Sequence, residues 1–237
     1  MRVLLLSSLI FAVTVPLPPT RHPDAYLQIE IDSNHLAWQV SSIHFQLKRF
    51  DEKFVDYIEP IRQLHVNIAM FTIEEDDLQR KLGKIATKNL AKRLCLLFPA
   101  KITFDGVGRF GDQVLYGKLA NDSKNLLEQT KELAKKAFEE VRIPVYASER
   151  EPHMTIAEVP KKEFFLTQYI KYVDINKIKL NGSTYDEVFQ MMLCRRKKKI
   201  IDGICEDMIA IESISSCAGL RQSQKSQMIK ENRIVEQ

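Results

Sequence analysis

The sequence predicts an antiparallel α+β fold, on the basis of three observations. Segments with helical and with strand periodicity alternate along the chain, and hairpin turns recur between the strands. None of the 8 glycines belongs to the glycine-rich strand-to-helix turn that a dinucleotide-binding sheet requires. At 237 residues and 45% hydrophobic composition, the chain is long enough for one sizeable core or two small lobes packed together.

The N-terminal segment differs in composition from the rest of the chain. A nearly apolar run over residues 3–15 is followed by three prolines before residue 20. A run of this length is too short to span a bilayer, and it fits either a secretory signal peptide or an N-terminal extension. We therefore predict a signal-like or extension segment over 1–20, a folded domain over 21–214 and a flexible polar tail over 215–237.

The first half of the domain predicts two successive strand-and-helix units. Polar and apolar residues alternate over 26–31, which predicts a strand, and Ser33 can cap the helix that the following apolar spacing indicates. A second strand is predicted over 64–73. The acidic residues at 74–77 suit the start of a second helix, which cannot continue through Pro99.

The second half begins with a predicted hairpin. Strands over 102–107 and 113–119 are joined by a turn over 108–112 that contains two glycines. Asp122 or Ser123 can then cap a third helix, whose apolar residues recur at steps of three and four.

Three further strands are predicted after this helix. They cover 153–159, 188–194 and 208–214, and Pro160 ends the first of them. The basic run Arg195–Lys199 lies between the last two strands. We expect this run to be a solvated loop, with nuclear targeting and phosphate contact as the alternatives.

The overall charge suits an anionic ligand. A formal net charge of +4 and a pI near 8.8 favour a ligand such as a nucleotide, but they are too small for a protein that coats nucleic acid. The cysteines form neither a C-x-x-C pair nor a cluster at zinc spacing, so we expect reduced thiols, no metal site and no cofactor. The four cysteines are Cys95, Cys194, Cys205 and Cys217.

Two of the five histidines have the setting of a reactive pair. His65 and His153 each lie at the start of a predicted strand, and each is followed two positions later by a hydrogen-bonding side chain, Asn67 or Thr155. Because residues i and i+2 of a strand share a face, each histidine and its partner can reach the same bound group. The remaining histidines are expected to be solvated or boundary residues, and these are His22, His35 and His44.

This arrangement fits the cleavage of a phosphodiester without a metal ion. One group must take a proton from the attacking hydroxyl, and another must protonate the leaving oxygen on the opposite side of phosphorus. Imidazole suits both tasks because its ordinary pKa of about 6.5 allows one ring to be neutral and the other charged at the same pH. Thr155 and Asn67 can donate to the phosphate oxygens. The spacing alone leaves a purely structural role for the histidines open.

Longer segments carry a resemblance to a known family. Residues 102–114 (ITFDGVGRFGDQV), 116–119 (YGKL) and 151–155 (EPHMT) occur in the order found in the two-histidine (LigT-like) phosphoesterase superfamily. They resemble most the phosphoesterase-like central domain of A-kinase anchoring proteins of the gamma/delta type. The likeness extends over residues 26–213 and is strongest over 64–160.

The resemblance implies a fold of two pseudo-symmetric lobes, each an antiparallel sheet backed by helices, around a central cleft. It implies catalytic histidines at His65 and His153 and phosphate-binding residues at Asn67 and Thr155, with an RNA-type substrate such as a 2′,3′-cyclic phosphate or 2′,5′-linked oligoadenylate. Asn67 departs from the family's hydroxyl-bearing residue. An amide can still donate to phosphate, but it lacks the short reach of a hydroxyl, so weakened catalysis is an alternative.

Three functions therefore remain open from the sequence: a phosphodiesterase, an AMP- or CMP-binding module with weakened catalysis, and a scaffold. Kinase anchoring is implied by the resemblance alone, and the basic run is the candidate for RNA contact. Phe110 and Tyr116 are candidates for stacking on a base, with core packing as the alternative for Tyr116. The expected location is cytoplasmic or nuclear, or secreted if the apolar N-terminal run is a cleaved signal peptide.

Overall fold

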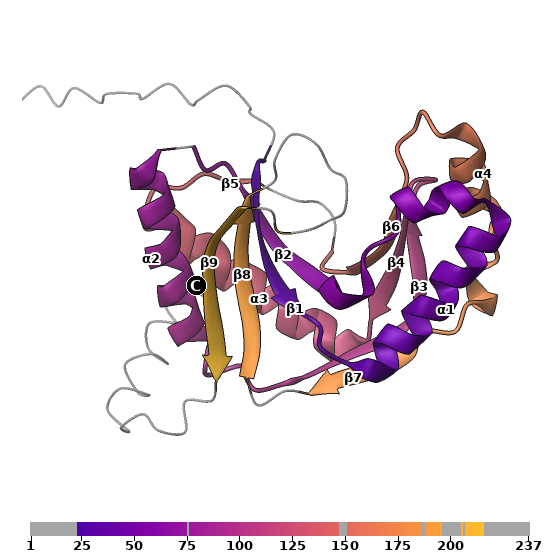
Figure 1. Cartoon of the computed structure of the whole chain (residues 1–237). Coiled ribbons are helices and arrows are strands. Elements are labelled where there is room, and N and C mark those ends of the chain that lie inside the picture. The colour runs from indigo at the N-terminus through magenta and orange to yellow at the C-terminus, as the bar shows by residue number, and fades with distance from the viewer. Residues whose placement is uncertain are drawn as a thin grey trace, which may run out of the picture.

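A computed structural model describes residues 23–74, 76–146, 151–185, 188–195, 205 and 207–215 (Figure 1). Within these residues the chain forms four α-helices and one nine-stranded antiparallel sheet. The helices are α1 (Asn34–Phe50), α2 (Asp77–Leu94), α3 (Asn121–Glu139) and α4 (Phe164–Tyr172). The strands are β1 (Ala25–Glu30), β2 (His65–Phe71), β3 (Lys101–Phe110), β4 (Val114–Leu119), β5 (Val145–Tyr146), β6 (Met154–Glu158), β7 (Asn181–Tyr185), β8 (Val188–Arg195) and β9 (Asp207–Ser215).

The sheet consists of two four-stranded halves that meet at its centre. The strand order is β7-β3-β4-β6 in one half and β2-β1-β8-β9 in the other, and β5 pairs with β2. Between the halves, β6 and β2 share only the pair Met154 and Val66. The predicted α+β class is therefore confirmed, and the expected two lobes correspond to these two halves. The inner strand of each half is the one that carries a histidine motif.

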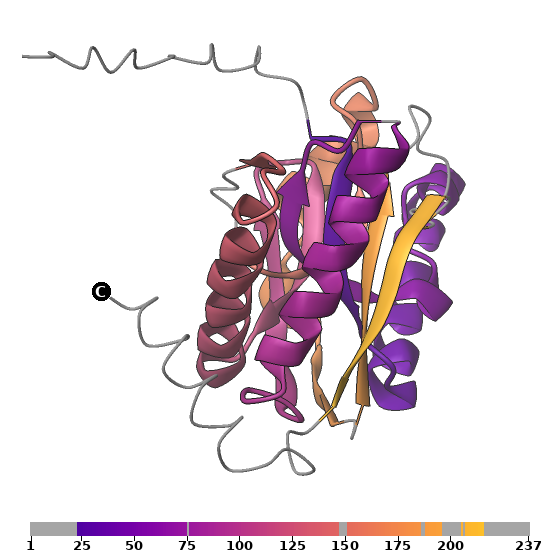
Figure 2. The ribbon, with the colours of Figure 1, turned by 90° about the vertical axis from the view of Figure 1, so that its left-hand side faces the viewer.

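Helices back each half of the sheet. Helices α2 and α3 lie side by side and pack on β9 and β2 (Figure 2), and the rings of Phe71 on β2 and Phe138 on α3 stack at 3.8 Å. In the other half, α1 packs against β7 (Figure 1). The buried apolar side chains of both halves belong to one continuous core. Burial of this core holds the two inner strands in place.

Most of the predicted elements are confirmed within one to four residues. The side chain of Ser33 accepts from the backbone N–H of Leu36, as expected of a helix cap, and Asp76 caps α2 in the same way. The predicted cap of α3 is wrong, because Ala120 occupies that position and the hydroxyl of Ser123 instead accepts from Thr103. Helix α4 and strand β7 were not predicted, because they are short and lack a clear period.

The prediction of reduced thiols is wrong. Cys194 at the end of β8 and Cys205 just before β9 form a disulfide, with their Cα atoms 5.3 Å apart, and Cys95 is also disulfide-bonded. The prediction relied on the absence of cysteines close together in the sequence. Cys194 and Cys205 are 11 positions apart, and the pairing of β8 with β9 brings them together. Cys217 lies outside the described residues.

Two other sequence predictions fall mainly outside the described residues. These are the N-terminal segment over 1–20 and the tail, of which only Ser215 is described, at the end of β9. Within the part of the chain that the structure describes, none of the helices combines the length and the apolar character that a membrane crossing needs.

Candidate active site

The two inner strands bring both predicted histidine motifs to one face of the sheet. Val66 on β2 lies opposite Met154 on β6 in an antiparallel pair. The flanking residues continue this register, so that His65 lies toward Thr155 and Asn67 lies toward His153, and all four side chains leave the sheet on the same side. The two histidines therefore stand diagonally across the junction between the halves.

Alternation along the strands explains why this face is polar. Val66, Met154 and Ile156 point to the opposite side and are fully buried in the core. Their burial fixes the register, because a slip by one residue would turn the histidines inward. The histidine rings are themselves largely covered, with 6% of His65 and 9% of His153 exposed.

Both imidazole rings are oriented by the same backbone contact. Nδ1–H of His65 donates to the carbonyl oxygen of Gln63 at 2.8 Å, and Nδ1–H of His153 donates to that of Glu151 at 2.7 Å. A carbonyl oxygen can only accept, so Nδ1 carries the proton in each ring. Nε2 is therefore the nitrogen that bears the lone pair when either ring is neutral.

A buried carboxyl group lies behind His65. Oε1 of Glu59 is 3.5 Å from Nδ1 of His65, and the Glu59 side chain is only 11% exposed. The segment reaches this place because Ile58 bridges Ala157 and the backbone N–H of Glu59 donates to Ile156 on β6. Glu59 was missed in the sequence, because a non-local pairing places it and no local spacing marks it.

Burial favours the neutral form of both groups. It raises the pKa of Glu59 to about 8, with a smaller contribution from the charge of Glu158. Burial likewise lowers the pKa of His65, and the neighbouring His153 lowers it further, while the hydrogen bond to Gln63 opposes the shift. At neutral pH the contact between Glu59 and His65 therefore joins two neutral groups.

Aromatic rings surround His153 instead. The rings of Phe110 and Tyr116 stack at 4.1 Å. Both make edge-to-face contacts with the His153 ring, at centroid distances of 4.7 Å and 5.2 Å and interplanar angles of 74° and 62°. Tyr116 can lie flat here because its neighbour across the strands is Gly108, where any Cβ would collide with the tyrosine ring. Glu151, whose carbonyl oxygen accepts from His153, also forms an ion pair with Lys124 through its side chain.

Unpaired side-chain oxygens gather on the His65 side. Asn67 on β2 is the register partner of Gln28 on β1, so both amides lie on the same face. The amide oxygens of both residues are buried without a hydrogen-bond partner, as are the side-chain oxygen of Gln63 and one of Glu59. Buried acceptors normally have partners, so these atoms are suited to take donors from a bound molecule or water. Gln28 was not among the residues predicted from the sequence.

The structure thus brings together all six residues that the sequence predicted for the site, which are His65, Asn67, Phe110, Tyr116, His153 and Thr155. Of the basic run, Arg195 ends β8 and pairs with Asp24, and the rest lies outside the described residues. Within the described chain, no three histidine, cysteine or acidic residues converge in a way that would hold a metal ion.

His44 has a structural setting. It is buried, its Nε2–H donates to the carbonyl of Ile156 at 3.1 Å, and desolvation lowers its pKa to about 4. The sequence predicted a solvated or boundary residue. This expectation is wrong for His44, because the side of α1 that carries it packs inward. His35 is exposed as expected, and His22 lies outside the described residues.

Related proteins were found by sequence. The family model described as the 2′-5′ RNA ligase superfamily matches residues 38–180. Human A-kinase anchor protein 7 isoform gamma is 26% identical over an alignment of 200 residues, and the match covers 80% of this chain. The chain spans 57% of the length of that relative.

Solved structures share the fold. LigT of E. coli complexed with 3′-AMP matches with a TM-score of 0.53 at 14% identity, over 82% of this chain and 100% of LigT. The protein TT0787 of Thermus thermophilus matches with a TM-score of 0.51 at 18% identity, over 81% of this chain and 99% of that protein. At such identities the likeness concerns the fold alone.

Proposed function

The chain belongs to the 2′-5′ RNA ligase superfamily, and from this premise we propose that it is a metal-independent phosphodiesterase acting on RNA-type phosphodiesters. Candidate substrates are 2′,3′-cyclic phosphates and 2′,5′-linked oligoadenylate. The observation that carries the proposal is the diagonal placement of His65 and His153 on one face, each with Nδ1 engaged by a backbone carbonyl. Two oriented imidazoles of this kind suit a general base and a general acid.

The roles of the two histidines follow from their surroundings. Burial lowers the pKa of His65, so this ring is neutral at physiological pH and suits the base, which leaves His153 as the acid. Nε2 of His65 takes the proton from the attacking hydroxyl or water as its oxygen bonds to phosphorus. The bond from phosphorus to the leaving oxygen then breaks, and that oxygen receives the proton from Nε2 of His153.

The remaining site residues hold the substrate in this proposal. The Thr155 hydroxyl and the Asn67 amide donate to the non-bridging phosphate oxygens, where negative charge builds up. Phe110 is less buried than Tyr116, and in this proposal its ring stacks on the nucleobase. The complex of E. coli LigT with 3′-AMP supports a nucleotide as the bound species.

The proposal is tested by turnover in excess EDTA. Purified protein is expected to cleave a 2′,3′-cyclic nucleotide or 2′,5′-oligoadenylate at an unchanged rate when EDTA is added, because the proposed acid and base are both side chains. Activity that disappears with the chelator and returns with zinc or magnesium would contradict the mechanism.

A second candidate function is nucleotide binding with weakened catalysis, and Asn67 is the observation that favours it. In this case the protein binds AMP or CMP and shows no turnover of either substrate class. Isothermal titration calorimetry beside a product assay separates the two functions. Binding without turnover would replace the first proposal, and the absence of both would leave only a scaffolding role.

The disulfide bonds favour the secreted alternative for the location of the protein. Disulfides persist in oxidising compartments and are rare in the cytosol and nucleus, and Cys95, Cys194 and Cys205 are all disulfide-bonded. Maleimide labelling of acid-quenched cells is expected to modify these residues only after reduction. Labelling without reduction would favour the cytoplasmic or nuclear location.

A further inference from the structure

Two neighbouring helices carry an unusual surface. Neither α1 nor α4 contains an aspartate or glutamate, whereas α3 contains four and α2 contains one, Asp77 at its first position. The two carboxylate-free helices touch where the ring of Phe50 stacks on that of Tyr169 at 3.9 Å. They form one end of the molecule, remote from α2 (Figure 1).

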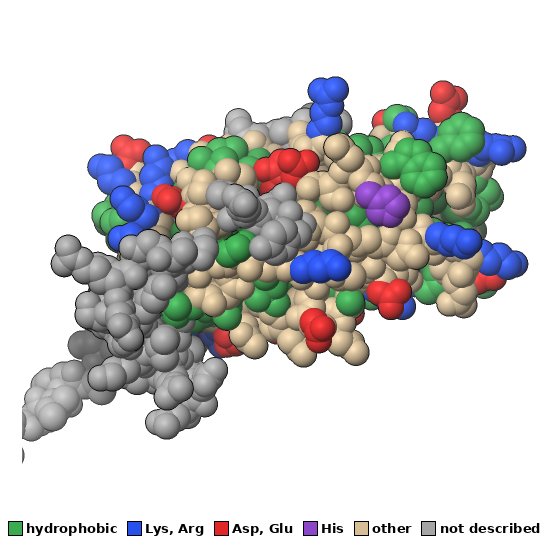
Figure 3. All heavy atoms as spheres, turned by 90° about the horizontal axis from the view of Figure 1, so that it is seen from below, with side chains coloured by type: hydrophobic (Ala, Val, Ile, Leu, Met, Phe, Trp, Pro, Cys, Tyr) green, Lys and Arg blue, Asp and Glu red, His purple; other side chains and the backbone are tan. Residues whose placement is uncertain are grey.

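Large aromatic side chains project from these helices. The exposed fractions are 68% for Trp38 and 62% for Phe45 on α1, and 78% for Phe165 and 72% for Tyr172 on α4. Single exposed hydrophobic residues are ordinary, but a cluster of them on adjacent elements marks an interaction surface. Seen from below, hydrophobic side chains stand among Lys and Arg side chains, with a few Asp and Glu side chains, at this end of the molecule (Figure 3).

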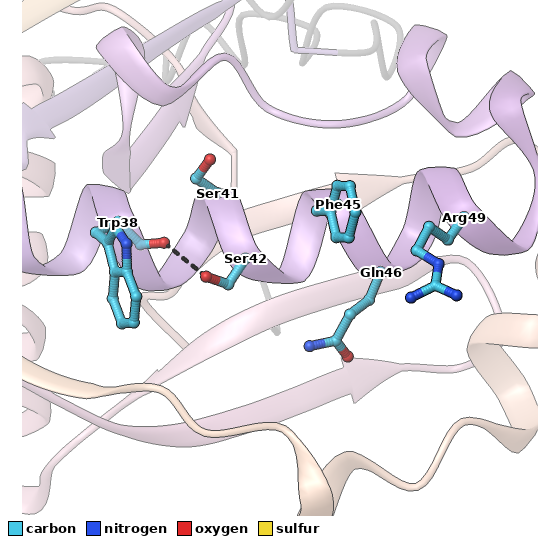
Figure 4. Close-up of a pocket in the computed structure, with 6 residues that line it drawn as sticks. All are labelled: Trp38, Ser41, Ser42, Phe45, Gln46 and Arg49. Carbon is cyan, nitrogen blue, oxygen red and sulfur yellow. Dashed lines mark hydrogen bonds between the residues drawn. The ribbon is translucent and has the colours of Figure 1, made fainter.

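The surface is hollowed at two places. A shallow hollow of about 520 Å³ runs along α1 between Trp38 and Arg49, with the labelled side chains directed outward from the helix (Figure 4). A second hollow of about 350 Å³ lies between Phe50 and the α4 residues Phe165 and Tyr172. Consecutive residues of α1 line the two hollows, Arg49 the first and Phe50 the second.

The cations on this surface lie over the exposed rings. The guanidinium carbon of Arg49 is 5.9 Å from the centre of the Phe45 ring, and Nζ of Lys171 is 5.2 Å from that of Tyr172. Carboxylates flank both helices. Asp51 follows α1, Glu163 precedes α4 and Asp174 follows it, whereas the two helices themselves carry three cations and no carboxylate. The aromatic surface itself therefore has a positive character.

We propose that this surface docks the protein on the interface of an anionic lipid bilayer. Aromatic rings beside lysine and arginine are the side chains that settle at the level of lipid headgroups, with the rings among the upper acyl chains and the cations at the phosphates. The surface comprises Trp38, Phe45, Arg49, Phe165, Lys171 and Tyr172.

The composition favours a bilayer over other partners. A nucleic acid is held chiefly by neutralising several phosphates. Helices α1 and α4 offer only three lysines or arginines, against six aromatic rings that are more than half exposed, the four of the surface together with Phe50 and Phe164. A protein partner usually buries one compact cluster of anchors in a central pocket. Here the rings are spread along two helices and the hollows between them are shallow.

The only tryptophan of the chain is Trp38, so its fluorescence reports on this surface directly. With vesicles of phosphatidylcholine mixed with phosphatidylserine, the emission is expected to shift to the blue and the protein to sediment with the vesicles. Pure phosphatidylcholine vesicles should bind about tenfold more weakly, since Arg49 and Lys171 then lack anionic lipid.

Substitutions that leave Trp38 in place make the test specific. Phe45→Ser and Phe165→Ser are each expected to weaken vesicle binding about tenfold, because each removes a ring that enters the interface. Leu78→Ser and Ile85→Ser on α2 are the matched controls, since these side chains are similarly exposed, at 66% and 50%, but lie away from the surface. The controls should bind vesicles like the wild type.

Several outcomes would overturn the proposal. An emission maximum that vesicles of either composition leave unchanged would exclude insertion of this surface. A blue shift that depends on protein concentration without lipid would identify a second copy of the chain as the partner. A shift caused by single-stranded oligonucleotide and not by vesicles would identify a nucleic acid. Equal losses for the α2 controls would show that the binding is not specific to α1 and α4.

Discussion

His65 and His153 lie at the starts of the inner strands of the two half-sheets, His65 as the first residue of β2 and His153 just before β6, but their surroundings differ. Each ring is held by a backbone carbonyl two residues earlier. Behind His65 lie a buried carboxyl group and unpaired amide oxygens, whereas His153 is enclosed by two aromatic rings. One backbone arrangement thus places two identical side chains, and the surrounding residues differ, with burial lowering the pKa of His65.

This difference offers a physical basis for assigning different roles, general base and general acid, to the two histidines. In the proposed mechanism, burial keeps His65 neutral so that it can take a proton, and His153 then gives one up. The following predictions test whether the two sides of the site differ in this way, from the largest expected effect to the smallest.

The largest effect is expected from removing either histidine. His65→Ala and His153→Ala should each lower the rate of substrate cleavage by about two to four orders of magnitude, the usual contribution of a positioned acid or base. The double variant should be hardly slower than either single variant, because the two rings act in the same step. Single-turnover rates, with circular dichroism as the control for folding, give the measurement. Near-normal turnover in one variant would exclude that residue as the acid or base.

The placement of these histidines could be anticipated from sequence because it depends on local alternation. Each motif lies on a strand whose intervening residues are apolar, so the polar face and the core face were evident before the strands were paired. The same reasoning identified β1, whose residues Leu27 and Ile29 are buried while Tyr26 and Gln28 share the face of His65.

The surroundings of the histidines could not be anticipated, because they come from non-local contacts. Glu59 reaches His65 through a bridge to β6, and Gln28 becomes the neighbour of Asn67 only when β1 pairs with β2. The prediction of reduced thiols at Cys194 and Cys205 failed for a similar reason, because the pairing of β8 with β9 joins them and no short spacing in the sequence marks them. Local pattern therefore predicts which side chains share a face, whereas the partners across the sheet require the fold.

The next largest effect concerns Glu59 and the pH dependence of stability. The pKa of Glu59 is about 8 in the folded protein, above its value of 4.5 in an unfolded chain, so the folded state holds the proton more tightly. The free energy of unfolding should therefore fall as pH rises from 4.5 to 8, by about 2 to 4 kcal/mol, and Glu59→Gln should remove this slope. Urea unfolding at several pH values measures it.

The same variant tests the pairing with His65. Glutamine resembles the neutral carboxyl group, so turnover of Glu59→Gln near pH 7 should remain within about threefold of the wild type. His44 and His65 contribute an opposite slope, since their lowered pKa values cost stability as pH falls below 6.5, and this slope should be the same in both proteins. A large loss of rate would show that Glu59 acts as a charged partner of His65.

A smaller effect is expected where the two motifs differ, at Asn67 and Thr155. Asn67→Thr should raise turnover about tenfold, the value of one modest hydrogen bond to a charged group. It should raise the rate more than it tightens ground-state nucleotide binding, because only a contact made in the transition state speeds the chemical step. Calorimetry beside a product assay distinguishes these effects. If the wild type binds AMP without turnover and Asn67→Thr does not restore it, the site is a receptor.

The smallest effect is expected from the aromatic residues. It decides on which side of the phosphate the nucleobase lies. Phe110→Ala should weaken nucleotide binding about fivefold with little change in kcat, because stacking of a base contributes equally before and during the reaction. Tyr26→Ala is the matched control, since Tyr26 stacks beside His65 at 6.5 Å as Phe110 lies beside His153 at 4.7 Å. If only Phe110→Ala weakens binding, the nucleobase lies on the His153 side. The unpaired amide oxygens on the His65 side can then accept from the ribose or from water. If only Tyr26→Ala does so, the base lies beside His65, and the rings around His153 serve to pack that histidine.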